Sequence, residues 1–280
     1  MPDVLPSPNY ELWCYTPSFD GNIILAVIYC ILLGGHLVIL LRDVANFGIP
    51  LLIGGILEII GYGCRIYSHY NLDNIVVYTI QLVLILVAPL LMAPTLYMFL
   101  GRLISKVYGE GLAIRPQNWL FTGFFICNII CFLIQCIGAG LLPQESLSNQ
   151  VQRYSYIVFA GLLFQSVIYL LVVILALLLH FRMRKSVNTL GSRTHWQAYL
   201  ISFYVITILL LVRTLLRVIE FAAQPSEYIN TQEWILFVFD AGCILSVLAL
   251  SFIWYNLKPR LEPVYIEDLE YPRRNIFQLK

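Results

Sequence analysis

The stretch Arg213-Thr214-Leu215-Leu216-Arg217-Val218-Ile219-Glu220 decides how this chain folds. Its three charged residues are spaced i, i+4 and i+7, which places them on one face of a helix. The apolar run that contains them, 198–223, is long enough to cross a bilayer as a helix. An ionisable side chain at membrane depth costs about 2.5–3.5 kcal/mol on insertion scales. We therefore expect these side chains to face protein partners, water or a ligand rather than lipid.

The composition predicts an all-α polytopic membrane protein. The chain has 280 residues, of which 60% are hydrophobic and 12% are charged, whereas soluble domains are about 45–50% apolar and 25% charged. Seven apolar runs reach about 20 residues, the length that a spanning helix needs. These runs cover residues 22–41, 47–68, 76–100, 119–141, 156–179, 197–221 and 233–255.

The positions of lysine and arginine predict the orientation of the seven spans. The segments on one side of the membrane contain a single basic residue, Arg153, and those on the other side contain all the rest that lie outside the spans. The positive-inside rule then places the N-terminus outside and the C-terminus in the cytoplasm. We expect an extracellular tail (1–21), a seven-helix domain (22–255) and a short cytoplasmic tail (256–280). A Cys14–Cys64 disulfide on the outer face is left open.

The polar residues of the spans are predicted to gather in the outer half of the bundle. Three acids and three arginines share this depth: Glu58, Glu220, Asp240, Arg65, Arg213 and Arg217. Four amides accompany them: Gln81, Asn128, Gln135 and Gln165. One interpretation is a set of interhelical ion pairs and hydrogen bonds that holds the bundle together. The other is a solvated cavity that opens toward the outer leaflet and binds a polar or amphiphilic ligand. We favour the cavity because six charges exceed what assembly needs, although some pairs can be structural.

Two prolines and one histidine lie inside the spans. Pro89 and Pro94 each remove a backbone donor from the third span and are expected to kink it. A static kink and a hinge that opens the cavity are both compatible with the sequence. For His36 we favour a hydrogen-bonded core residue over a proton relay.

Several chemistries do not fit the sequence. No lysine lies within a span to form a retinal Schiff base, and the four histidines are scattered over both faces. There is no phosphate-binding glycine loop, and no serine or cysteine nucleophile stands near a membrane histidine. We expect no catalytic residues, no metal, no cofactor and no nucleic-acid partner, so the protein is not expected to be an enzyme.

A series of short motifs runs along the whole chain. They are Tyr15-Thr16-Pro17-Ser18, Glu58-x2-Gly61-Tyr62-x2-Arg65, Gln81, Ala88-Pro89, Ala93, Tyr97, Gly101-Arg102, Gln135-x2-Gly138, Gly161-x3-Gln165, Arg213-x3-Arg217-x2-Glu220, and Glu233 followed by Phe239-Asp240. Together these motifs resemble those of the fungal lipid-translocating exporter family. Members are seven-span proteins linked to aminocholesterol resistance, sphingoid-base release and porphyrin movement. Three positions depart from the family pattern. Asn128 replaces a common acid, Phe237 replaces a tyrosine, and Lys258-Pro259 replaces His-Pro.

The resemblance implies a plasma-membrane translocator of lipids or lipid-like toxicants that gives drug resistance and serves the stress response. Its partners would be membrane lipids and a cationic amphiphile such as a sphingoid base or sterol amine. The acids Glu58, Glu220 and Asp240 would attract the cationic head group, and the arginines would hold the acids or contact phosphate. Transport would be facilitated, or coupled to protons through Glu58 or Asp240. A seven-span lipid-sensing receptor or regulator is the alternative.

Overall fold

The computed structural model describes residues 16–43, 46–108, 116–142, 151–190, 196–222 and 232–255. Within these ranges every regular element is helical, and seven helices are long and apolar enough to span a membrane. The first six spans are α1 (Phe19–Asp43), α2 (Ile49–Ser68, preceded by the 3₁₀ turn η1, Asn46–Gly48), α3 (Ile75–Tyr108), α4 (Pro116–Leu141), α5 (Val151–Leu190) and α6 (Trp196–Ala222). The seventh is divided into α8 (Glu233–Ile235), η2 (Leu236–Ala241) and α9 (Gly242–Tyr255). The predicted all-α class and the seven spans are confirmed.

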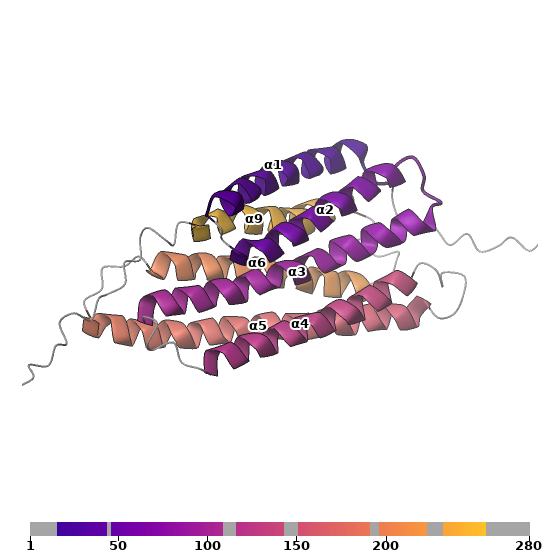
Figure 1. The fold of residues 1–280 in the computed structure, drawn as a ribbon. Helices are drawn as coiled ribbons and strands as arrows, with labels where there is room; N and C mark the ends of the chain where they lie inside the picture. The colour runs from indigo at the N-terminus through magenta and orange to yellow at the C-terminus, as the bar shows by residue number, and fades with distance from the viewer. Residues whose placement is uncertain are drawn as a thin grey trace, which may run out of the picture.

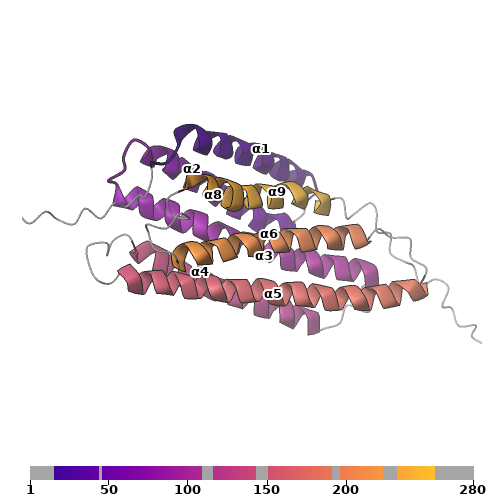
Figure 2. The same cartoon turned by 180° about the vertical axis from the view of Figure 1, so that it is seen from behind.

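The seven spans lie along a common direction (Figure 1 and Figure 2), and their contacts close a ring in which consecutive spans are antiparallel and α1 and α9 are parallel. Each of α1 to α6 packs against the next, and α9 packs against both α6 and α1. The helix α3 also contacts α6 across the ring, so these two helices pack together at the centre of the bundle. With an odd number of spans, α1 begins and α9 ends at opposite ends of the bundle. We refer to the end where α2 connects to α3 as the α2–α3 end; its predicted location outside the cell remains a prediction.

The surface and the interior of the bundle have the polarity expected in lipid. Large aliphatic side chains such as Ile31 and Leu41 of α1 are exposed, because hydrocarbon rather than water surrounds a spanning helix. Charged and amide side chains from α2, α3, α4, α5 and α6 and from η2 are buried instead. The polar groups thus meet one another inside the bundle, where each can find a partner.

Small residues bring α2 and α3 into close contact. A Cβ atom on Gly54 would lie 2.7 Å from the carbonyl oxygen of Ala88, and one on Gly61 would lie 2.6 Å from Cγ1 of Ile85. Glycine at both positions therefore allows the backbones to approach more closely than side chains would permit. Glu58 lies between them along α2 and is carried into the interior of the bundle.

The seventh span contains a π-helical segment around Asp240. In η2 the backbone follows the wider π-helical turn over Leu236–Ala241, and Asp240 lies within it. Such segments occur mostly as short bulges in α-helices, frequently at functional sites. The hydroxyl of Tyr29 in α1 donates to the carbonyl oxygen of Ala241 at 3.1 Å, which fixes this segment to the first span.

Three further predictions concern α3, His36 and the cysteines. The helix α3 continues across both Pro89 and Pro94. His36 is a buried core residue, as favoured: its Nδ1 lies 3.1 Å from the Tyr255 hydroxyl and its Nε2 lies 3.0 Å from the Leu248 carbonyl oxygen. Cys64 is a free cysteine, and its suggested disulfide partner, Cys14, lies outside the described residues.

Candidate functional site

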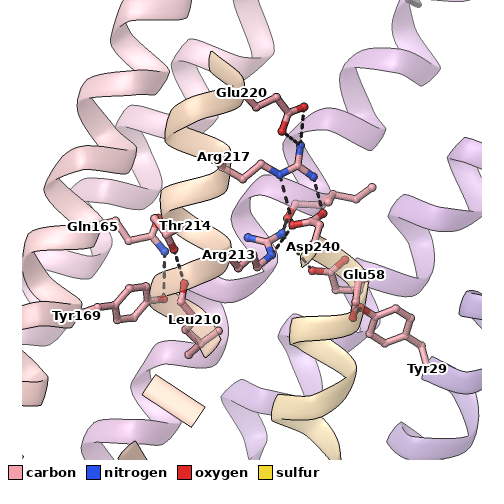
Figure 3. Close-up of polar contacts among 12 residues, drawn as sticks. Tyr29, Glu58, Gln165, Tyr169, Leu210, Arg213, Thr214, Arg217, Glu220 and Asp240 are labelled. Carbon is pink, nitrogen blue, oxygen red and sulfur yellow. Dashed lines mark hydrogen bonds and ion pairs between the residues drawn. The ribbon is translucent and has the colours of Figure 1, made fainter. Parts of the chain in front are cut away.

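Five side chains of alternating charge form the centre of the site. They occur in the spatial order Glu220, Arg217, Asp240, Arg213 and Glu58, and we call them the alternating chain (Figure 3). Three of them come from α6, one from η2 and one from α2. The i, i+4, i+7 spacing on α6 aligns its three residues on one face, and the ring places that face against the second and seventh spans.

Asp240 is the best-paired member of the alternating chain. Its Oδ2 accepts a hydrogen bond of 2.5 Å from Nη2 of Arg217, and its Oδ1 lies 3.4 Å from Nε of the same guanidinium. The Nε of Arg213 lies 2.6 Å from Oδ1, as a close ion pair that is out of line for a hydrogen bond. Two guanidinium groups therefore hold one carboxylate, an arrangement that compensates its buried charge.

The alternating chain is exposed at one end and buried at the other. The Glu220 side chain is 38% exposed and accepts hydrogen bonds of 2.9 and 3.2 Å from Nη1 of Arg217. Arg217 and Asp240 are buried, and at the far end the Glu58 side chain is 1% exposed. Glu58 lies ten residues before the end of α2, which is about 15 Å from the α2–α3 end. The alternating chain thus extends from the margin of the bundle to its interior.

Glu58 is incompletely paired. Its Oε1 lies 3.6 Å from Nη2 of Arg213, beyond hydrogen-bond distance, and accepts no hydrogen bond from the residues that the structure describes. The hydroxyl of Tyr62, one helical turn further along α2, is likewise buried without a hydrogen-bond partner in the described part of the chain. The ring of Tyr62 stacks on that of Tyr29 with centroids 5.6 Å apart. An acidic oxygen, a phenol and two aromatic rings therefore lie together at the buried end.

The two prolines of α3 explain two of the polar contacts. A proline has no backbone N–H, so it leaves the carbonyl four residues earlier without its helical donor. For Pro89 that carbonyl belongs to Ile85, which accepts a 2.5 Å hydrogen bond from Nη2 of Arg213. For Pro94 it belongs to Leu90, which accepts a 2.6 Å hydrogen bond from the Asn128 amide. The prolines thus create acceptors that fix α6 and α4 to α3.

The remaining amides lie outside the alternating chain. Gln135 of α4 donates to Oε1 of Gln165 in α5 at 2.8 Å, and Gln165 donates to the hydroxyl of Tyr169 at 3.1 Å. Gln81 of α3 is buried, and its Oε1 has no hydrogen-bond partner among the described side chains and backbone. The pairing of Gln135 with Gln165 is the interhelical contact that the assembly interpretation describes.

A second ion pair, between Arg65 and Glu233, lies at the α2–α3 end. Nη2 of Arg65 lies 3.0 Å from Oε1 of Glu233, and both carboxylate oxygens of Glu233 accept from the backbone N–H of Ser18, at 3.1 and 2.9 Å. His69 lies 2.7 Å from the Pro17 carbonyl oxygen through its Nδ1. Pro17 and Ser18, which directly precede α1, are therefore attached to the second and seventh spans.

The structure brings together half of the predicted site residues. Glu58, Arg213, Arg217, Glu220 and Asp240 form the alternating chain, whereas Arg65 pairs with a residue that the prediction did not include. The described contacts do not test the predicted cavity, which remains a prediction. The prediction omitted Tyr29, Tyr62 and Glu233. Tyr62 could have been found, because it follows Glu58 by four residues and so shares its helix face.

The hydrogen bond from Asn128 should depend on Pro94. We expect Asn128→Leu to cost about 1 kcal/mol of stability, typical of an interhelical hydrogen bond in a membrane. In a Pro94→Ala background the restored N–H of residue 94 can bind the Leu90 carbonyl, so the same substitution should cost much less. Thermal unfolding of the four proteins in detergent measures this coupling. Equal costs in the two backgrounds would contradict the explanation.

The Arg65–Glu233 pair should contribute less to stability than the pairs of Asp240, because Glu233 lies nearer the margin of the bundle. We expect Glu233→Gln to cost about 1 kcal/mol in thermal unfolding and to weaken the attachment of the segment before α1. Hydrogen exchange at the Ser18 amide reads that attachment directly. An unchanged exchange rate would show that the negative charge of Glu233 is not needed to hold Ser18.

A polytopic helical membrane protein with a network of ionisable side chains inside its bundle is the class that these observations define. Residues 51–258 match the family model described as RTA1 like protein. The chain belongs to this family, which is the lipid-translocating exporter family that its motifs resemble.

Three relatives from Saccharomyces cerevisiae illustrate the range of the family. Protein RTA1 is 27% identical over 271 residues, covering 88% of this chain and 84% of the relative. Protein RTM1 is 32% identical over 217 residues, covering 76% of this chain and 68% of the relative. The sphingoid long-chain base transporter RSB1 is 33% identical over 126 residues, covering 45% of this chain and 33% of the relative. No solved structure matches the chain significantly.

Proposed function

We propose that this protein moves a cationic amphiphile of the sphingoid-base type across the plasma membrane, and so gives resistance to toxic lipid-like compounds. Membership of the family and the relative named as a sphingoid long-chain base transporter support a role in lipid transport or resistance. The observation that carries the proposal is the alternating chain, which extends from the half-exposed Glu220 to the buried Glu58. Ionised groups at this depth are costly and are typical of substrate pathways.

The chemistry of such a substrate fits both parts of the bundle. The positive head group would interact with carboxylates in the interior, where the low dielectric strengthens a charge pair. The alkyl chain would remain among the aliphatic side chains that the spans expose to lipid. We propose that no covalent bond of the substrate changes, so the amphiphile should leave the protein unaltered.

The orientation of the protein in the membrane is part of the proposal. The distribution of basic residues supports an extracellular α2–α3 end, which would make Glu220 the member of the alternating chain nearest the outside. Short epitope tags at the two termini would test this in intact cells, with the N-terminal tag accessible to antibody and the C-terminal tag accessible only after permeabilisation.

Reconstituted vesicles test the function directly. Purified protein is placed in liposomes, a fluorescent sphingoid base is added to one leaflet, and its movement is timed against protein-free vesicles. An Ile31→Val protein, altered only on the lipid-exposed surface of α1, provides a control for handling and should transport like the natural chain. Chromatography of the recovered base should show a single unchanged compound.

Each outcome of the vesicle assay has a defined meaning. Movement above the protein-free rate supports the translocator. Tight binding of the base without movement would overturn it and favour the lipid-sensing alternative. Chemical conversion of the base would overturn the proposal that the protein is not an enzyme.

A further inference from the structure

Charge counting separates Glu58 from the other acids of the site. In the described interior network, Arg65 pairs with Glu233, and Arg217 pairs with both Glu220 and Asp240. Arg213 is closest to Asp240, at 2.6 Å, and is 3.6 Å from Glu58. Three arginines thus face four carboxyl groups. Because Glu220 is 38% exposed and can be solvated, Glu58 is the buried carboxyl group that is left without an arginine of its own.

An uncompensated buried charge is expensive, and the usual response is to neutralise the group. Protonating Glu58 gives up the least favourable electrostatic interaction, because Glu58 has the longest ion pair of the four carboxyl groups. It also has the lowest exposure. Its Oε1 is also the only carboxylate oxygen in the described part of the chain that is buried without a hydrogen-bond partner. A proton on Glu58 balances the network when no ligand is bound.

The surroundings of Glu58 could bind an ammonium group in place of that proton. A primary ammonium group has three N–H donors, and two buried acceptors, Oε1 of Glu58 and the hydroxyl of Tyr62, lack partners among the described residues. Tyr29 and Tyr62, whose rings stack on each other, both interact electrostatically with Glu58, and aromatic faces attract cations. Figure 3 shows Tyr29 next to Glu58, with Arg213 and Asp240 beyond.

We propose that Glu58 and Tyr62 form an exchange site, which holds either a proton on Glu58 or the primary ammonium group of a long-chain amine. The inference rests on the proposed function and adds its energy coupling. A protonated Glu58 and an incoming ammonium ion give a Glu58 carboxylate paired with ammonium and one proton released to water. No net charge enters the interior. The protein therefore exchanges amine for protons, and a proton gradient across the membrane can drive the amine.

The charged and titratable groups around Glu58 are accounted for in this scheme. Tyr29 faces it from α1, Arg213 and Arg217 from α6 and Asp240 from η2, while Tyr62 lies on its own helix. Arg217 and Asp240 are occupied by each other at 2.5 Å, and the Tyr29 hydroxyl is occupied by the Ala241 carbonyl. Glu58 is the group left to exchange a proton.

Proton release on amine binding tests the exchange site without transport. Decylamine is added to the purified protein in weakly buffered detergent containing a pH indicator, and its binding is measured by calorimetry. We expect about one proton to be released per bound amine, and the apparent Kd to rise about tenfold for each unit by which the pH is lowered. Binding without proton release would overturn the proposal.

Four matched comparisons give the test its specificity. Decyltrimethylammonium has the same chain and charge but no N–H donor, and it should bind at least about tenfold more weakly. Ethylamine, the same head group without a chain, should also bind weakly; if it binds as well as decylamine, the ligand is a free amine rather than a lipid. Glu58→Gln should abolish proton release. Tyr62→Phe should weaken amine binding but leave proton release intact. Proton release that persists in Glu58→Gln would place the exchange elsewhere.

The two proposals can fail separately. If decylamine binds with proton release but no base crosses the vesicles, the exchange site stands and the translocator is wrong. If base crosses equally well with the natural chain and with Glu58→Gln, the translocator stands and the exchange site is wrong.

Discussion

Asp240→Asn is expected to cost about 3–5 kcal/mol of stability, the penalty of leaving a buried charge without its partner. Asp240 accepts from Arg217 at 2.5 Å and lies 2.6 Å from Arg213. An amide of the same shape keeps the volume but removes the charge that both guanidinium groups face. The effect is read as the midpoint of thermal unfolding in detergent and as the yield of folded protein from the membrane.

Glu58→Gln is the matched control, because it makes the same carboxylate-to-amide change in the same network. We expect its stability to equal that of the natural chain, since an amide resembles the protonated acid. In an Asp240→Asn background, however, Arg213 needs Glu58 as its only remaining acid, so the second change should become costly. Additive effects of the two substitutions would show that Glu58 and Asp240 do not share Arg213.

Arg213→Met is the second substitution with a large expected effect, about 3 kcal/mol or more. It removes one of the two cations at Asp240 and also leaves the Ile85 carbonyl, freed by Pro89, without its donor. Methionine has a similar length and little polarity, so packing is largely kept. Thermal unfolding in detergent again provides the measurement.

Neutralising the partner should recover part of the loss. Asp240→Asn in the Arg213→Met background removes the excess negative charge, so the double variant should unfold closer to the natural chain than the sum of the single effects predicts. A control at the same helix depth, Leu215→Met, changes an exposed side chain and should have little effect. If Leu215→Met is as harmful as Arg213→Met, the loss cannot be assigned to the charge.

Depth in the membrane could be predicted from the sequence, but the direction of each side chain around its helix could not. The lengths of the apolar runs predict all seven spans within a few residues, except that α3 and α5 continue further. Depth alone grouped Arg65 with the residues around Asp240. In the structure Arg65 forms an ion pair with Glu233 of α8, a contact between spans that depth alone does not predict.

The backbone at the site was also only partly predictable. The absence of a proline N–H identifies Ile85 and Leu90 as the carbonyls that lose their helical donors. Which side chains bind them, Arg213 and Asn128, depends on how α6 and α4 pack against α3. The π-helical segment around Asp240 has no signal in composition or spacing, since it reflects the contacts of the seventh span with its neighbours.

The central claim is that the acids of this network have separate tasks, with Asp240 holding the bundle together and Glu58 exchanging its cation. The most direct measurement is transport of fluorescent sphingoid base by Glu58→Gln in proteoliposomes, using protein whose melting midpoint equals that of the natural chain. We predict a rate indistinguishable from protein-free vesicles. Transport at the natural rate by this folded variant would contradict the account.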